Sequence, residues 1–163
     1  MDGLWLGLRL LVLLGLANTA PLVAKRWLRS RWATPLDGGL KFFDGRPLLG
    51  ASKTVRGVFV AIVATALGAL ILGLPVTAGA MLGAGAMLGD VMSSFIKRRM
   101  GTAPSTRATG LDQIPEALVP LLLLQETLAL TWAHIVAVTT VFFVLEIPLA
   151  WLSHRWGLRD QPF

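Results

Sequence analysis

The stretch Gly79–Arg99 reads GAMLGAGAMLGDVMSSFIKRR, in which a long apolar run ends in an acid, two serines and a basic cluster. Ionisable residues in or near a bilayer core are costly and usually mark a functional site. The polar side chains that follow the apolar run repeat at helical spacing: Asp90, Ser93, Ser94 and Lys97. Spacings of three, four and seven residues predict that all four share one face of a helix. Asp90 and Lys97 would lie about 10 Å apart along the axis, the reach of a metal-bound triphosphate.

The same stretch contains a short duplication, Gly79–Ala84 followed by Gly85–Asp90. Each copy carries two glycines four residues apart, a spacing that lets another helix approach closely. Plain helix packing explains the duplication better than a catalytic role, and a closely packed helix would hold Asp90 rigidly.

The composition indicates an integral membrane protein. Hydrophobic residues make up 55% of the 163 residues, and the mean hydropathy is +0.68. Charged residues make up only 15%, against about 25% in soluble domains. The chain has no cysteine, which excludes disulfides, thiolate catalysis and cysteine-ligated metals. We expect one membrane-embedded domain over residues 1–163.

Hydropathy predicts an all-α fold with about five transmembrane helices, at residues 3–24, 55–74, 76–96, 114–130 and 132–153. The first has no basic residues ahead of it and no small-residue cleavage site, so it is expected to be a retained helix.

The distribution of positive charge predicts the orientation. Every lysine and arginine except Arg9 falls within residues 25–56, 97–107 or 155–159. With five spans, all three segments lie on one side, so the positive-inside rule predicts the N-terminus outside and the C-terminus inside. This banding fits an anionic headgroup or a nucleotide better than a nucleic acid duplex, so no nucleic acid partner is expected.

Asp90 and Asp112 form the first candidate chemical group. Two carboxylates on one membrane face suit a hard divalent cation such as Mg²⁺, which usually takes one or two carboxylates and completes its shell with water and phosphates. Two structural alternatives remain open. Asp112 could simply cap the helix that follows it, and Asp90 could form a structural salt bridge with Lys97 or Arg98.

The second candidate group lies in residues 44–57, DGRPLLGASKTVRG. A glycine-rich turn with hydroxyls and cations can bind phosphate through its backbone N–H groups and side chains. The segment is not a P-loop, because Ala51 and Ser52 separate Gly50 from Lys53 and no strand precedes it. The alternative for Lys53 and Arg56 is anchoring at the membrane surface.

At these residues the chain resembles the CTP-dependent lipid cytidylyltransferases, and more narrowly the archaeal CDP-archaeol synthases, small relatives of bacterial CDP-diacylglycerol synthase. Three segments carry the resemblance: residues 44–57, residues 89–99 and residues 111–114, which read LDQI. It implies a multi-helix membrane fold with a polar cavity facing the cytosol. The resemblance departs at Pro115, where the family usually has a second acid, and whether Glu116 replaces that acid stays open.

The resemblance also implies roles for individual residues. Asp90 and Asp112 would hold Mg²⁺, and Lys97 would neutralise phosphate charge. The residues expected to bind nucleotide or phosphate are Ser52, Lys53, Thr54, Arg56, Ser93, Ser94, Lys97 and Arg98. Those expected to be catalytic are Lys53, Asp90, Lys97 and Asp112.

The implied reaction joins CTP to an isoprenoid-ether glycerol phosphate, 2,3-bis-O-geranylgeranylglycerol 1-phosphate, and releases pyrophosphate. The protein would be a multi-pass cell membrane enzyme of phospholipid biosynthesis, in contact with membrane lipids and with its active site on the cytoplasmic side. The alternatives are a CTP-dependent polyprenol or lipid kinase, and an anion-binding transporter or scaffold subunit. The sequence does not decide between a monomer and a homodimer, and it leaves Arg9, Asn18 and Glu146 without a role.

Overall fold

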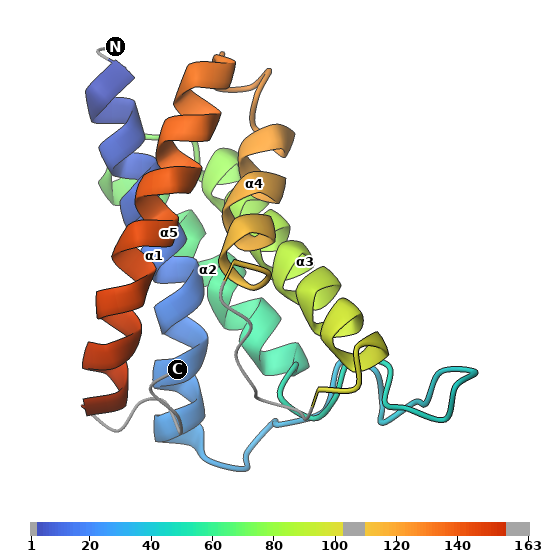
Figure 1. The fold of residues 1–163 in the computed structure, drawn as a ribbon. Coiled ribbons are helices and arrows are strands. Elements are labelled where there is room, and N and C mark those ends of the chain that lie inside the picture. The colour runs from blue at the N-terminus through green and yellow to red at the C-terminus, as the bar shows by residue number, and fades with distance from the viewer. Residues whose placement is uncertain (1–2, 103–109, 156–163) are drawn as a thin grey trace.

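The computed structural model describes residues 3–102 and 110–155. Five helices form the fold: α1 (Gly3–Leu28), α2 (Val55–Ile71), α3 (Val76–Arg99), α4 (Gln113–Leu123) and α5 (Trp132–Arg155). The closest helix packing is of α3 against α2 and α4, and of α1 against α2 (Figure 1). The described residues contain no named strand, only two isolated bridges, Pro35 with Thr54 and Lys41 with Pro47. The fold is therefore all-helical, as predicted.

Three helices are long and apolar enough to cross a membrane: α1, α3 and the Trp132–Leu149 part of α5. The other two are shorter, because α2 has 17 residues and α4 has 11, whereas a spanning helix needs about 20. The structure thus supports an integral membrane protein with three long apolar helices.

The predicted 114–130 span differs most from the structure. Helix α4 ends at Leu123, and the chain then turns, with Ala129 in the left-handed region at φ 50°. Leu128 and Leu130 pack onto the core from this turn. Hydropathy counts such leucines as helix because it measures apolarity and not backbone direction.

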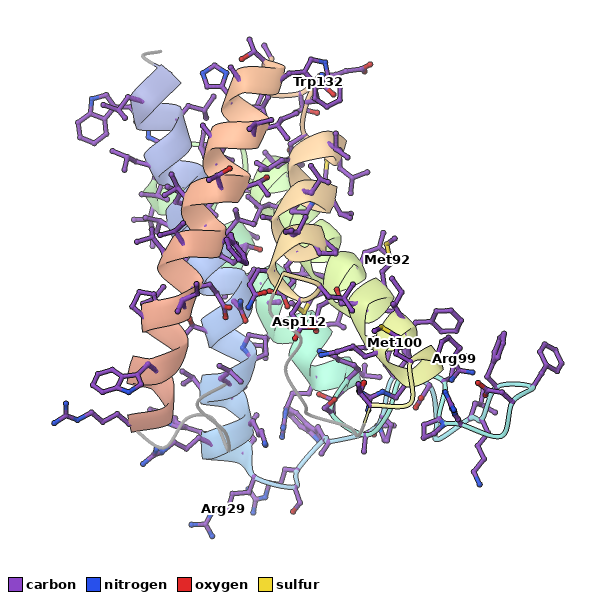
Figure 2. All side chains as sticks on the ribbon, in the orientation of Figure 1. Arg29, Met92, Arg99, Met100, Asp112 and Trp132 are labelled. Atoms are coloured by element: carbon purple, nitrogen blue, oxygen red, sulfur yellow. The ribbon has the colours of Figure 1, made fainter. Side chains whose placement is uncertain are left out.

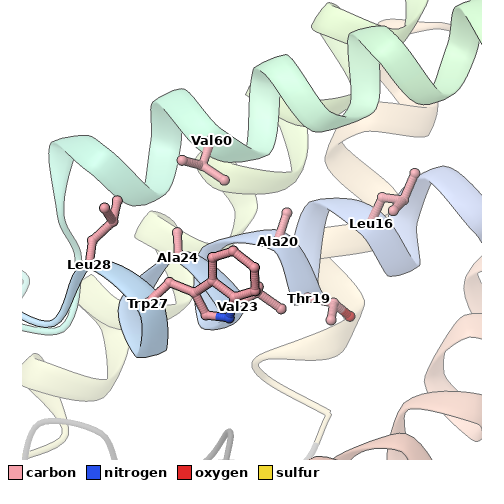
Figure 3. Close-up of a pocket in the computed structure, with 8 residues that line it drawn as sticks. All are labelled: Leu16, Thr19, Ala20, Val23, Ala24, Trp27, Leu28 and Val60. Atoms are coloured by element: carbon pink, nitrogen blue, oxygen red, sulfur yellow. The ribbon is translucent and has the colours of Figure 1, made fainter.

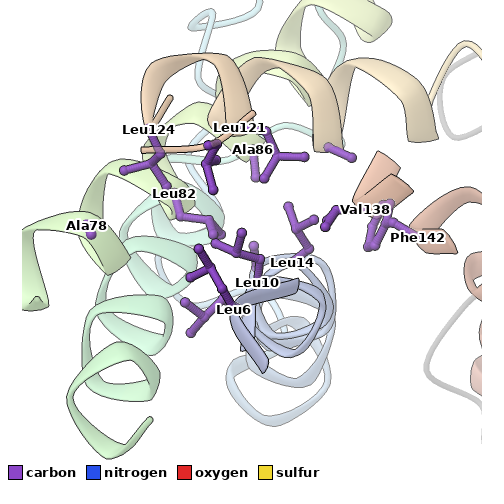
Figure 4. Packing of buried hydrophobic residues seen from close by; sticks show 14 of the residues in the cluster. Leu6, Leu10, Leu14, Ala78, Leu82, Ala86, Leu121, Leu124, Val138 and Phe142 are labelled. Carbon is purple, nitrogen blue, oxygen red and sulfur yellow. The ribbon is translucent and has the colours of Figure 1, made fainter. Parts of the chain in front are cut away.

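The core lies between α1, α3, α4 and α5 (Figure 4). Its fully buried side chains include Leu10 and Leu14 from α1, Leu82 from α3, Leu121 from α4 and Ile135 from α5. Large apolar side chains also cover the outside, with Leu67, Ile71 and Val136 each more than half exposed. An apolar exterior around an apolar core is the pattern expected of a protein surrounded by lipid.

The duplicated glycines of α3 pack against two different helices, as their spacing predicted. A Cβ on Gly83 would lie 2.9 Å from the Cα of Ile62 in α2, and one on Gly85 would lie 2.7 Å from the Cα of Pro120 in α4. A Cβ on Gly89 would overlap the backbone of Pro115 and lie 2.8 Å from the Glu116 nitrogen. The start of α4 therefore rests directly on α3 beside Asp90.

Candidate active site

Lys53 and Asp90 bring two of the sequence motifs together. The Lys53 Nζ lies 2.5 Å from both carboxylate oxygens of Asp90. Lys53 sits just before α2, whose first turn is capped by the Thr54 hydroxyl, which accepts a hydrogen bond from the Gly57 N–H at 3.2 Å. The two side chains are 20% and 18% exposed, so the pair is reachable from solvent. This contact joins the loop ahead of α2 to the middle of α3.

Lys97 and Asp112 form a second ion pair. Lys97 lies about two helical turns beyond Asp90 along α3. The Lys97 Nζ lies 2.6 Å from Asp112 Oδ1, and the side chains are 9% and 15% exposed. Asp112 makes no side-chain capping hydrogen bond at the start of α4, so capping does not account for it. Asp90 is paired with Lys53, in place of the Lys97 or Arg98 partner considered from the sequence. The two carboxylates are thus each matched with a lysine from another part of the chain.

The hydroxyl groups of the motifs occupy different environments. Ser93 is fully buried, with its Oγ 2.9 Å from the Gly89 carbonyl oxygen and 2.7 Å from that of Leu111. Ser94 is also buried, whereas Ser52 is exposed in the loop before Lys53. Ser93 therefore ties α3 to the segment that carries Asp112, and Ser52 is the hydroxyl open to an incoming ligand.

Arg56 and Arg98 are buried cations with different surroundings. The Arg56 Nη1 donates to the carbonyl oxygens of Arg29, at 3.0 Å, and Arg31, at 2.5 Å, which fastens the end of α1 to the start of α2. Arg98 is 3% exposed and lies within electrostatic range of Asp112. Within the part of the chain that the structure describes, its Nε and Nη1 have no hydrogen-bond partner. Leaving buried N–H groups unsatisfied is costly, so Arg98 is suited to an anion that completes these bonds.

The loop before α2 is shaped by Asp37. Its carboxylate accepts hydrogen bonds from the N–H groups of Gly39, Leu49 and Gly50, at 2.9–3.1 Å. Burial opposes ionisation of the Asp37 carboxyl, but these bonds outweigh burial and hold its pKa below the ordinary value. The charged form of Asp37 therefore fixes the turn that leads to Lys53.

A network of polar side chains lies close to the Lys53–Asp90 pair. It includes Asn18 and Glu146, to which the sequence assigned no role. The Asn18 Nδ2 of α1 donates to Glu116 Oε2 at 2.9 Å and lies 3.4 Å from Glu146 Oε1 of α5. The Gln113 Nε2 donates to Glu146 Oε2 at 2.8 Å, and the Gln113 Oε1 accepts from the Gly110 N–H at 2.7 Å. The network therefore joins α1, α4 and α5. Its sequence signal is a small number of polar residues within otherwise apolar segments.

The position of Glu116 is relevant to the second acid that the family usually has and that Pro115 replaces in this chain. Its carboxyl group is close to those of Asp90 and Glu146 and to the Lys53 ammonium group. Asp112, by contrast, is paired with Lys97. An acid of α4, one position beyond the proline, therefore lies close to Asp90.

The donor set fits a hard divalent cation only in part. Carboxylate oxygens are the ligands that Mg²⁺ prefers, and Asp90, Glu116 and Asp112 provide them. Among the described residues, however, no group of three or more acidic or histidine side chains is arranged to hold a metal ion. An ion at this site would therefore take the rest of its ligands from water and a bound phosphate, which is usual for Mg²⁺.

An apolar groove runs along the C-terminal half of α1, against Val60 of α2 (Figure 3). It is lined almost entirely by apolar atoms, from Leu16, Ala20, Val23, Ala24, Trp27 and Val60. The polar cluster is visible in Figure 2 around Asp112, inside the bundle. The molecule thus offers a charged site and an apolar groove.

Comparison with known proteins places the chain among the enzymes it resembles. The CarS-like family model, described as CDP-archaeol synthase, matches residues 72–163. The CDP-archaeol synthase of Methanopyrus kandleri is 40% identical over 139 residues, covering 79% of each chain. That of Sulfolobus acidocaldarius is 32% identical over 170 aligned residues, covering all of both chains.

A solved structure agrees with the sequence relatives. It belongs to a protein described as an intramembrane enzyme for archaeal membrane lipids biosynthesis, and it superimposes with a TM-score of 0.72 at 30% identity. The match covers 86% of this chain and 90% of the other. Sequence family, relatives and fold agree, and the chain belongs to the CDP-archaeol synthase family.

Proposed function

We propose that the protein transfers a cytidylyl group from CTP to an isoprenoid-ether glycerol phosphate, giving a CDP-activated lipid and pyrophosphate. The observation that carries the proposal is the set of ion pairs Lys53–Asp90 and Lys97–Asp112, with the buried Arg98 beside them. Cations and carboxylates gathered between apolar helices suit a reaction between two anions in a membrane protein. Membership of the CDP-archaeol synthase family supports the same reaction.

In the proposed reaction, an oxygen of the lipid phosphate attacks the α-phosphorus of CTP, and the bond from that phosphorus to the bridging oxygen of pyrophosphate breaks. The lipid phosphate is already an anion, so no strong general base is needed. The work of the protein is to hold two anions together and to stabilise the charge that builds on the leaving group. Lys53, Lys97 and Arg98 supply the positive charge for this.

Each lysine is held by a carboxylate until substrate arrives. Binding of a triphosphate would draw Lys53 and Lys97 toward the phosphates and free the oxygens of Asp90 and Asp112 for Mg²⁺. The ion, when bound, would neutralise phosphate charge and polarise the phosphorus–oxygen bonds. Asp90 and Asp112 are the carboxylates proposed to hold it, with Glu116 next to Asp90.

The proposal extends to the lipid chain and to the orientation in the membrane. The apolar groove of α1 and α2 suits an isoprenoid chain, because it is apolar and opens on the outside of the bundle along the C-terminal half of α1. We propose that the basic segments face the cytoplasm, with the N-terminus outside, the C-terminus inside and five membrane crossings in all. The short helices α2 and α4 would then cross together with the turns that follow them.

The test uses purified protein, Mg²⁺ and the ether-lipid phosphate, with CTP labelled at either the α- or the γ-phosphate. We expect label in the lipid fraction only from the α-position, and none when EDTA removes the metal. Label only from the γ-position would make the protein a lipid kinase. No EDTA-sensitive label from either position, with folded protein, would favour an anion-binding transporter or scaffold subunit.

A further inference from the structure

Residues 40–47, called here the aromatic hairpin, form a tight turn beside the C-terminal end of α3. The Phe42 N–H donates to the Arg46 carbonyl oxygen at 2.8 Å, and the Gly45 N–H donates to that of Phe42 at 2.9 Å. Gly45 has a φ of 75°, which favours glycine. The chain thus doubles back sharply and presents Phe43 at its tip, and it projects sideways from the bundle (Figure 2).

The aromatic hairpin is fastened to α3 through Arg99. The Arg99 guanidinium group lies 2.6 Å from Asp44 Oδ1 and donates to the Pro47 carbonyl oxygen at 2.6 Å, while Arg46 Nη1 donates to the Arg99 carbonyl oxygen at 2.6 Å. The same guanidinium lies 4.6 Å from the centroid of the Phe42 ring. These contacts fix the direction in which the tip points.

The tip is apolar and lies open. Phe43 is 100% exposed and Leu40 is 64% exposed, and the neighbouring Lys41 and Arg46 are exposed as well. A rigid turn that holds a phenylalanine fully out of the protein interior is unfavourable in water. The same combination of aromatic and basic side chains is favourable at a membrane–water interface.

The aromatic hairpin continues the apolar exterior of α3. Leu88, Met92, Ile96 and Met100 follow one another at four-residue intervals, are 40–67% exposed and lead along α3 to the hairpin. Figure 2 shows Met92 and Met100 on this path, with Arg99 next to the hairpin. The surface that would face lipid along α3 therefore runs directly into the hairpin at the end where the basic residues gather.

We propose that the aromatic hairpin rests in the headgroup layer of the bilayer, with Phe43 and Leu40 toward the acyl chains and Lys41 and Arg46 toward anionic headgroups. A second copy of the chain is a poorer partner, because the exposed Lys41 and Arg46 would face the same cations across a symmetric contact. The anchor would hold the loop that carries Lys53 at a constant depth. The proposal concerns lipid contact alone, so it can fail while the proposed reaction stands.

The absence of cysteine makes the test direct. A spin label is attached to Phe43→Cys, and the full protein is reconstituted into vesicles that contain anionic phospholipid. Collisions of the label with oxygen, which concentrates in the bilayer, are compared with collisions with a water-soluble nickel complex. Lipids labelled at the headgroup and along the acyl chain calibrate the depth, and Met92→Cys serves as a lipid-facing reference.

We expect the Phe43→Cys label at the depth of the headgroups or the upper acyl chains, with a several-fold preference for oxygen over the nickel complex relative to a label in water. Adding Asp44→Ala should release the hairpin and lower that preference. A label that meets the nickel complex as freely as a label in water would overturn the proposal. Spin–spin broadening that disappears on dilution with unlabelled protein would overturn it as well, in favour of contact between two copies.

Discussion

At the scale of single residues, the two ion pairs explain how charged side chains are stabilised among apolar helices. Unpaired charges would be costly there, and each lysine offsets a carboxylate from another segment. The sequence indicated candidate catalytic residues, namely Lys53, Asp90, Lys97 and Asp112. It did not indicate which lysine pairs with which acid, because positions on one helix face carry no information about the loop that folds against it.

Asp90→Asn is the sharpest single substitution at this scale. It keeps the shape of the side chain but removes the charge opposite Lys53 and one proposed metal ligand. We expect the rate of lipid labelling to fall by about 100-fold or more, the loss typical of a charge-stabilising group. The protein should remain folded, because the site is partly exposed. Glu126→Gln, in the exposed turn after α4, is the matched control and should leave the rate unchanged; an Asp90→Asn protein as active as this control would contradict the assignment.

Glu146 and Gln113 are predicted to act as one unit that positions the start of α4. Glu146→Leu and Gln113→Leu each remove the 2.8 Å hydrogen bond between them, so each should lower kcat by about 10–100-fold, as loss of a supporting contact behind a site does. The double variant should be no worse than either single one. Glu146→Gln, which keeps an acceptor, should recover part of the activity. Leu145→Ala, on the exposed side of α5, is the control, and fully multiplicative losses would refute the shared role.

At the scale of helices, α3 positions the site because its glycines allow α2 and α4 to pack against it at close range. The repeated glycine spacing predicted close packing, and the structure confirms it. The sequence also located the starts of α2, α3 and α5 within a residue or two. It failed at the end of α4, where apolar turn residues extended the hydropathy signal, and at Asn18 and Glu146, whose contacts join helices far apart in the sequence.

Two glycine substitutions should have opposite effects on stability. Gly89→Ala adds a methyl group where the Pro115 backbone already lies, so it should lower the free energy of unfolding by about 1–3 kcal/mol, the usual cost of overpacking. Gly15→Ala in α1 meets no atom within 4 Å and should raise it by about 0.5–1 kcal/mol through helix propensity. Thermal unfolding in detergent, followed by tryptophan fluorescence, measures both. Equal effects of the same sign would argue against the tight α3–α4 contact.

At the scale of the whole molecule, a charged cluster lies inside an apolar bundle, and an apolar groove lies on the surface of α1 and α2. This arrangement suits an enzyme that joins a water-soluble nucleotide to a lipid. The composition predicted a membrane protein, and the three long apolar helices agree with it. The number of crossings and their direction stay predictions, because charge bias orients helices only relative to a bilayer.

The central claim is that the lipid phosphate itself attacks the α-phosphorus of CTP. The most direct test supplies lipid phosphate labelled with oxygen-18 in its phosphate oxygens, together with unlabelled CTP, and follows the isotope by mass spectrometry. The account predicts that all of the label stays in the CDP-lipid, including its bridging oxygen, and that the released pyrophosphate carries none. Oxygen-18 in the pyrophosphate, or a lipid diphosphate in place of a CDP-lipid, would contradict it.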